Sequence, residues 1–138
     1  MAKIKADFNS ESTKFVPLPV DTYKLQVREE PELTQSRQGN DMVVFDFVVV
    51  EAEDSSLNGR HVLDRVVISN TKRRLKQVAL AAGVAWDDEG LELEDFVGET
   101  LEANVVIEDY KDNDGQDQQT NRISKYHFTD PDEAQAEA

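Results

Sequence analysis

The stretch that decides the fold is Gly39–Gln77, GNDMVVFDFVVVEAEDSSLNGRHVLDRVVISNTKRRLKQ. Two runs rich in β-branched and apolar residues, Met42–Val50 and His61–Ser69, flank a turn at Ser55–Gly59, which predicts two strands. The apolar period then changes to that of a helix, with Asn70 or Thr71 as the expected N-cap and Gly83 as the expected end. Its apolar positions are Leu75, Val78, Ala79 and Ala82.

Two further segments, Thr22–Glu29 and Thr100–Tyr110, alternate with the period of two that is typical of half-buried strands, and Gln119–Phe128 is interpreted as the final strand. Pro31–Asn40 reads as a connector, and 86–97 as a short helix or a loop. In the 42–50 strand, Phe45 and Phe47 face the core if Asp46 faces water. The order is three strands, a helix and two strands. We therefore predict a mainly β, five-stranded Greek-key barrel of the oligonucleotide/oligosaccharide-binding (OB) type, with one helix between strands three and four. Other small α+β folds share this order.

Length and composition indicate one domain. In 138 residues we expect an N-terminal arm at 1–14, a folded domain at 15–129, and a disordered acidic tail at 130–138. The tail has no bulky apolar side chain, and a surface for protein partners is expected at its acidic residues Asp130, Asp132, Glu133 and Glu137. There is no cysteine, no apolar run of membrane-spanning length and no apolar leader, so we expect a cytoplasmic protein without a membrane partner.

The net charge of −14 is unevenly distributed. Residues 1–80 contain 12 Lys/Arg and 12 Asp/Glu, whereas residues 81–138 contain 3 and 17. An acidic total usually argues against nucleic acid as a partner, because phosphate contacts need cations. Segregation of the acidic residues weakens that argument, since the balanced half can still present a basic face.

No motif indicates catalysis, a metal or a cofactor. The two histidines, His61 and His127, fall within predicted strands and outside any nucleophile motif. The segment Asp109–Gly115 superficially matches a calcium loop, but Lys111 occupies a ligand position and no glutamate stands at the twelfth. It is better interpreted as a hairpin tip. No glycine-rich phosphate loop is present.

Cations and aromatics in the predicted strands and hairpins give the stronger signal. In an OB barrel, the outer face of strands two and three meets the loops that follow strands one and four. Cations there contact phosphates and aromatics stack on bases; the alternative is an ordinary charged surface. The candidate binding residues are Lys24, Arg28, Arg37, Arg60, Arg65, Lys111, Arg122 and Lys125, with Tyr110 and Tyr126 for stacking.

The expected helix start is an additional basic patch of Lys72, Arg73, Arg74 and Lys76. Cations in the first turn are disfavoured by the helix dipole, so the cluster indicates a partner. That partner is either DNA or the acidic segment 87–109 of the same chain.

Five segments together resemble a family of phage-encoded single-stranded DNA-binding proteins of replication modules. They are Leu18–Tyr23, Gly39–Phe47, Gly59–Val62, Arg74–Gly83 and Asn121–Tyr126, and the resemblance covers about residues 15–128. It implies an OB fold, sequence-tolerant binding of single-stranded DNA, and a role in phage replication or recombination, inside the infected host cell. Asp21 departs from the glycine usual before Thr-Tyr, and the outer strand faces are poor in aromatics.

We therefore expect a non-catalytic protein that coats single-stranded DNA, whose affinity for oligo-dT falls steeply with salt, and whose acidic tail recruits replication or recombination proteins. The first alternative is an acidic adaptor or DNA mimic that binds a basic protein, for which the acidic region 81–138 argues. The second is a small enzyme or enzyme subunit, for which only the abundant carboxylates argue.

Overall fold

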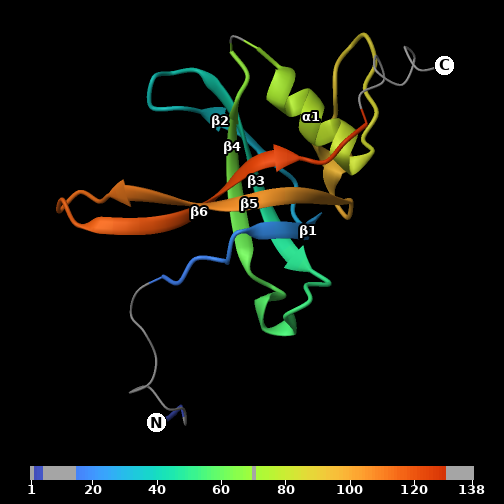
Figure 1. Cartoon of the computed structure of the whole chain (residues 1–138). Coiled ribbons are helices and arrows are strands. Elements are labelled where there is room, and N and C mark those ends of the chain that lie inside the picture. The colour runs from blue at the N-terminus through green and yellow to red at the C-terminus, as the bar shows by residue number, and fades with distance from the viewer. Residues whose placement is uncertain (1, 5–14, 70, 130–138) are drawn as a thin grey trace.

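The computed structural model describes residues 2–4, 15–69 and 71–129 of the chain. Six strands, one α-helix and two short 3₁₀-helices follow one another in this part (Figure 1). The strands are β1 Asp21–Val27, β2 Glu32–Gln35, β3 Asp41–Val50, β4 His61–Val67, β5 Thr100–Lys111 and β6 Asp117–Tyr126. The helices are α1 Arg73–Ala82, η1 Ser55–Leu57 and η2 Leu93–Phe96. The prediction of a mainly β fold with one α-helix before the last two strands is confirmed.

The strands form one antiparallel sheet in which β3 is the hub. One edge of β3 pairs with β4, and the other pairs with β2 near its start and with β1 near its end. β5 joins the far edge of β1, and β6 joins β5. β2 lies in the predicted connector Pro31–Asn40, so that prediction is wrong. None of the four β2 side chains is fully buried, which leaves no apolar alternation to reveal the strand.

The sheet is open. β4 and β6 approach within 8 Å between Cα atoms, but no hydrogen-bonded ladder joins these two strands in the part of the chain described. The predicted five-stranded barrel is therefore corrected to an open sheet of six strands. Side chains bridge β4 and β6 instead, as in the hydrogen bond that the Tyr126 hydroxyl donates to Asp64.

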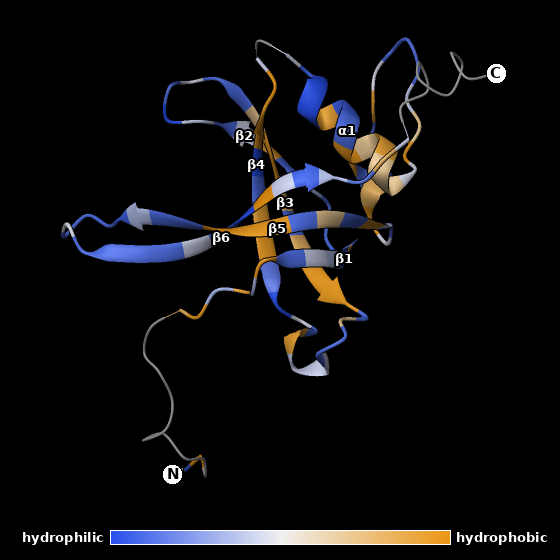
Figure 2. Cartoon of the chain, viewed as in Figure 1, coloured by the Kyte–Doolittle hydropathy of each residue, from blue (hydrophilic) through white to orange (hydrophobic). Residues whose placement is uncertain are grey.

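The core contains buried side chains from β1, β3, β4, β5 and β6. Phe45 and Phe47 of β3 are fully buried, as predicted, and the Phe45 ring meets that of Phe96 edge-on at 5.1 Å between centroids. Figure 2 shows the apolar colour concentrated where the strands cross, while the outer half of the β5–β6 hairpin is hydrophilic. The burial pattern agrees, because β5 is buried at Leu101, Ala103 and Val105 and exposed from Ile107 onward. The outer half of the hairpin therefore projects from the domain as an arm (Figure 1).

Helix α1 covers the core with Val78, Ala79 and Ala82. It ends at Gly83, as predicted, where a positive φ of 76° suits glycine. At its start Lys72 is the N-cap residue, and the Thr71 hydroxyl accepts a hydrogen bond from the Arg73 N–H at 3.1 Å; Asn70 lies outside the described residues. No helix in the described ranges is long and apolar enough to cross a membrane. The predicted C-terminal tail and most of the predicted N-terminal segment 1–14 also lie outside these ranges.

Candidate nucleic-acid interface

A groove of about 700 Å³ lies between the exposed face of β4 and the projecting β5–β6 hairpin. We call it the arm groove. It is lined by side chains from three separate segments: Phe15 from the N-terminal stretch, Leu63 and Arg65 from β4, and Tyr110 and Arg122 from the hairpin.

Strand alternation sets the β4 wall. Val62, Asp64 and Val66 are buried, so Leu63 and Arg65 point outward. Leu63 is 42% exposed although it is a large apolar residue. Arg65 pairs with Val44 across the β3–β4 ladder and forms no ion pair with any other described residue. This wall offers an apolar contact and an available guanidinium side by side.

The hairpin wall contributes an aromatic ring and a second arginine. Tyr110 is 48% exposed. The Arg122 Nε lies 3.2 Å from a carboxylate oxygen of Glu108, and both side chains are about half exposed. Exposed pairs of this kind contribute little to stability, so Arg122 can exchange its carboxylate for a phosphate at small cost.

The Phe15 side of the groove is held in place by hydrogen bonds to the backbone on either side of Pro17. Asn121 of β6 accepts a hydrogen bond from the Leu18 N–H at 2.8 Å and donates one to the Leu18 carbonyl at 3.0 Å. Arg60 donates to the Val16 carbonyl, and its guanidinium lies 5.4 Å from the centroid of the Phe15 ring. Phe15 is 55% exposed. A second exposed aromatic ring is therefore fixed at the groove.

Two carboxylates dilute the positive charge here. Glu108 belongs to the groove lining, and Asp46 of β3 lies beside it, with its Oδ1 2.7 Å from Nδ1 of the groove residue His61. Arg65 and Arg122 offset these two carboxylates, and the third carboxylate, Asp64, is paired with Arg74. The lining is therefore close to neutral overall. It is far less negative than the whole chain, whose net charge is −14.

The structure brings together only part of the predicted binding set. Arg65, Arg122 and Tyr110 line the groove, and Arg60 contacts the Phe15 ring beside it. The remaining predicted cations lie elsewhere. Lys24 pairs with Glu51 at 2.6 Å, Lys125 stands opposite Asn104, and Lys111 pairs with Asp117 at 3.1 Å. Arg28 donates to the Gln26 side chain, and Arg37 sits in the β2–β3 turn.

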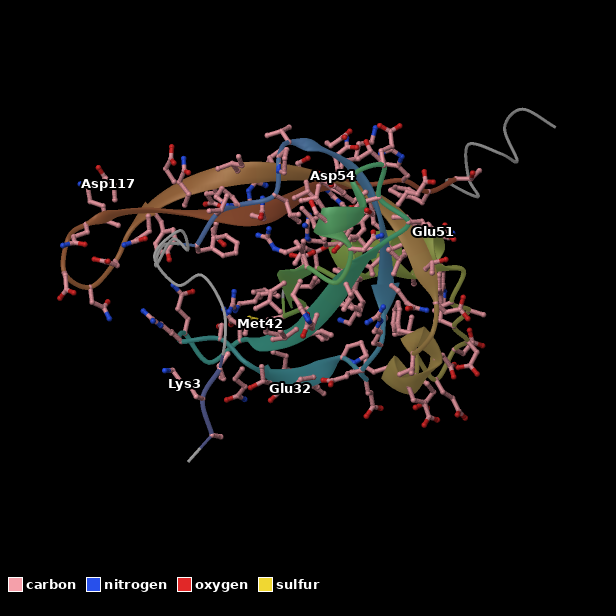
Figure 3. The ribbon with its side chains drawn as sticks, turned by 90° about the horizontal axis from the view of Figure 1, so that it is seen from below. Lys3, Glu32, Met42, Glu51, Asp54 and Asp117 are labelled. Carbon is pink, nitrogen blue, oxygen red and sulfur yellow. The ribbon has the colours of Figure 1, made fainter. Side chains whose placement is uncertain are left out.

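Figure 3 shows Asp117 at the far tip of the hairpin, well away from Glu51 and Asp54. The neighbours of Lys24 and Lys111 therefore lie at opposite ends of the molecule. A single basic face containing all the predicted cations does not form.

Tyr126 is not available for stacking, which corrects that expectation. It is 1% exposed, its ring packs against Phe47, and its hydroxyl donates to Asp64. Burial, with the nearby Asp64 carboxylate, raises the pKa of Tyr126 far above its usual value. The reason is a bulge: Asn104 and Val105 are consecutive on β5 but pair with Lys125 and Ile123, so Ser124 is an extra residue on β6. The extra residue reverses the alternation and turns Tyr126 inward.

The basic helix start divides into two parts. Arg74 donates from Nε to Asp64 at 3.0 Å and from Nη2 to the Ile123 carbonyl at 2.9 Å, and its guanidinium covers the Tyr126 ring at 5.3 Å. Its partner is therefore neither DNA nor the 87–109 segment, the two alternatives that the sequence leaves open. Arg74 joins α1, β4 and β6 where β4 and β6 share no ladder. Lys72, Arg73 and Lys76 remain exposed.

Phe15, Leu63 and the positioning residue Asn121 are missing from the candidates drawn from sequence. The signal at Phe15 was the Phe-Val-Pro-Leu-Pro run, which predicts an extended, stiff segment but not its neighbours. The predicted tail residues Asp130, Asp132, Glu133 and Glu137 lie outside the described residues. Within the described ranges no cluster of three or more His, Asp or Glu side chains could hold a metal ion.

A search of the curated proteins finds no match to this sequence. The family described as "Protein of unknown function (DUF669)" matches residues 4–136, nearly the whole chain, and therefore both walls of the arm groove. The chain belongs to the DUF669 family.

Proposed function

We propose that the protein binds single-stranded DNA in the arm groove, without catalysis and with little sequence preference. The observation that carries this proposal is that two exposed aromatic rings, Phe15 and Tyr110, and two exposed arginines, Arg65 and Arg122, line the same groove. Aromatic faces accept any base, and arginines accept the phosphates between bases. Duplex DNA buries its base faces, so this arrangement favours single strands.

The order of the strands supports the same proposal. The path β4-β3-β1-β5-β6, with α1 between β4 and β5, is compatible with an OB fold that is open between its third and fifth strands. β2 would then be an addition to the loop after the first strand. On that assignment, the arm groove would lie beside the outer face of the third strand and the last hairpin, both of which contribute to oligonucleotide binding in OB folds. The sequence resemblance adds phage DNA replication or recombination as the proposed setting.

A competing function, an acidic adaptor that binds a basic protein, is favoured by one surface. A hollow of about 530 Å³ beside β1 is lined by Asp21, Glu51, Glu53, Asp54 and Glu102, with Lys24 as its only cation. Glu51 and Asp54 lie together on this side in Figure 3. A basic partner could bind here while the arm groove stays empty.

The test is a titration of labelled oligo-dT with the full chain at about 50 mM salt, followed by fluorescence anisotropy. We expect binding that duplex DNA competes for poorly. Tyr110→Ala and Phe15→Ala should each weaken it by about 5- to 150-fold, which corresponds to about 1–3 kcal/mol per stacked base. Trp86→Ala is the matched control, because Trp86 is similarly exposed (45%) and lies outside the groove.

Two results would contradict the proposal. The first is no binding of oligo-dT at low salt. The second is an equal loss of affinity in the Trp86→Ala control, since binding would then not reside in the arm groove. The adaptor function replaces the DNA proposal if oligo-dT does not bind but a polylysine peptide does, and if Glu51→Gln and Asp54→Asn abolish the binding of that peptide.

A further inference from the structure

Another hollow lies between β2, the start of α1 and the segment that follows the helix. It measures about 590 Å³, and we call it the helix hollow. Its floor and walls are mainly apolar: Leu33, Ile68, Leu75, Trp86, Leu91 and Leu93. Leu33 is 62% exposed and Trp86 is 45% exposed, whereas the other four are partly buried against the core.

The two features that the fold does not explain meet at this hollow. β2 contributes only four residues to the sheet edge, and its one apolar side chain, Leu33, points into the hollow rather than into the core. The exposed cations of the helix start, Lys72, Arg73 and Lys76, form one rim of it. The first turn of α1 contains no acidic residue to offset these charges, and the helix dipole opposes them.

None of these three cations forms an ion pair with another described residue. The Lys76 ammonium group instead lies 6.0 Å from the centroid of the Trp86 ring. The arrangement is thus an apolar hollow, an exposed tryptophan at its mouth and three available cations on one side, in a chain of net charge −14. Tryptophan and arginine are enriched at the centre of protein interfaces, and charged residues such as lysine lie at their rims.

We propose that the helix hollow binds a short acidic, amphipathic segment of a partner protein. The partner's large apolar side chains would enter between Leu33 and Trp86, and its carboxylates would face Lys72, Arg73 and Lys76. The acidic residues Asp87, Glu89 and Glu92 lie beyond the opposite wall, around a neighbouring hollow, so repulsion from that side fixes the orientation of the segment.

The chemistry of the lining favours a peptide over nucleic acid. A base presents polar edges that need hydrogen-bond partners, and the apolar residues that make up most of this lining offer none. In the arm groove, by contrast, Thr120, Asn121 and two arginines stand among the lining residues. The two hollows therefore suit different ligands, one nucleic acid and one protein.

Trp86 is the only tryptophan in the chain, so its fluorescence reports directly on the helix hollow. The probes are two designed peptides that combine aspartates with phenylalanine and leucine, one with helical and one with alternating apolar spacing. Control peptides replace every aspartate with lysine, or every apolar residue with serine. The full chain is titrated with each peptide up to about 1 mM, at about 50 mM salt.

We expect at least one acidic peptide to shift the Trp86 emission to shorter wavelength in a saturable manner, and neither control peptide to do so. Leu33→Asp and the double variant Lys72→Glu/Arg73→Glu should each weaken binding at least about tenfold. Both changes affect exposed side chains, and circular dichroism checks that the fold is retained. Lys111→Glu, an exposed cation at the tip of the hairpin, is the matched control and should leave peptide binding unchanged.

Four results would overturn the inference. The first is no shift of the Trp86 emission with either acidic peptide, and the second is an equal shift with the lysine peptide. The third is an emission change on adding oligo-dT that the rim variants abolish, because the hollow would then belong to the DNA-binding surface. The fourth is an increase of about tenfold or more in peptide affinity when Asp130, Asp132, Glu133 and Glu137 are all converted to amides, because the chain's own tail would then be the occupant. Leu33→Asp should not alter oligo-dT binding, so failure of this inference and failure of the DNA proposal are separable.

Discussion

The salt dependence of oligo-dT binding can be worked out from the arm groove. For single strands, the logarithm of the binding constant falls with the logarithm of salt concentration by about 0.7 per phosphate neutralised. Contact by all eight cations predicted from the sequence would give a slope of about −5.6. The structure leaves Arg65 and Arg122 in the groove, with Arg60 beside it. Two to three contacts give a slope of about −1.4 to −2.1, or about 7- to 20-fold weaker binding between 50 and 200 mM salt.

Two substitutions separate charge from stacking. Arg65→Gln should make the slope shallower by about 0.7, because one phosphate contact is lost. Tyr110→Ala should lower affinity at every salt concentration and leave the slope unchanged, since stacking on a neutral ring releases no counterions. Lys24→Gln is the matched control: Lys24 is paired with Glu51 outside the groove and should affect neither quantity.

The assay is fluorescence anisotropy with labelled oligo-dT at four or more salt concentrations. A slope of about −5 in the unmodified protein would refute the reasoning, because it would require more phosphate contacts than the groove cations provide. An unchanged slope in Arg65→Gln would refute the placement of the DNA.

Three further predictions follow from the contacts described. Arg74→Met should lower the free energy of unfolding by about 2–3 kcal/mol in urea denaturation, because it leaves the buried Asp64 carboxylate without its cation. In the control Lys111→Gln, loss of an exposed ion pair should cost under about 0.5 kcal/mol. Equal effects would show that the Arg74 pair stabilises the fold no more than an exposed pair does. Because the pKa of Tyr126 is raised in the folded state, its contribution to stability is fully present below about pH 10, the pKa of tyrosine in the unfolded chain. Above that pH the unfolded chain ionises first, so the free energy of unfolding falls by up to about 1.4 kcal/mol per pH unit. Tyr126→Phe should flatten that alkaline loss of stability, and an unchanged pH profile would contradict the cause. Asn121→Ala should weaken oligo-dT binding several-fold by releasing the backbone that holds Phe15, with no further loss when combined with Phe15→Ala; additive losses would mean that the two act independently.

The sequence predicts best those elements whose local pattern coincides with their tertiary environment. Phe45 and Phe47 alternate with the partly exposed Val44 and Asp46 and are both buried, and Gly83 ends the helix in the left-handed conformation that glycine permits. β2 escaped prediction because it lies on a sheet edge with no fully buried side chain. For such a strand, pairing with β3 is decided by tertiary contacts alone.

The candidate site was harder to predict, for two physical reasons. A bulge at Ser124 reverses which face Tyr126 occupies, and nothing in the local sequence marks the extra residue. The role of Arg74 depends on Asp64, ten residues away, and on the Ile123 carbonyl, 49 residues away. The sequence names the basic residues, but only the folded chain decides which carboxylate or aromatic ring each one meets.

The absence of a ladder between β4 and β6 in the described structure has a consequence for association between molecules. Each of these strands has one edge whose backbone groups are not paired with another strand, and such edges readily recruit strands from other chains. Here the two edges lie next to each other, and Arg74 occupies the gap by bonding to Asp64 on one strand and to the Ile123 carbonyl on the other. Arg74 thus satisfies one free carbonyl of the β6 edge and ties that edge to a side chain of β4. We expect its loss to leave the β6 edge more open to strands of neighbouring molecules, and so to favour aggregation.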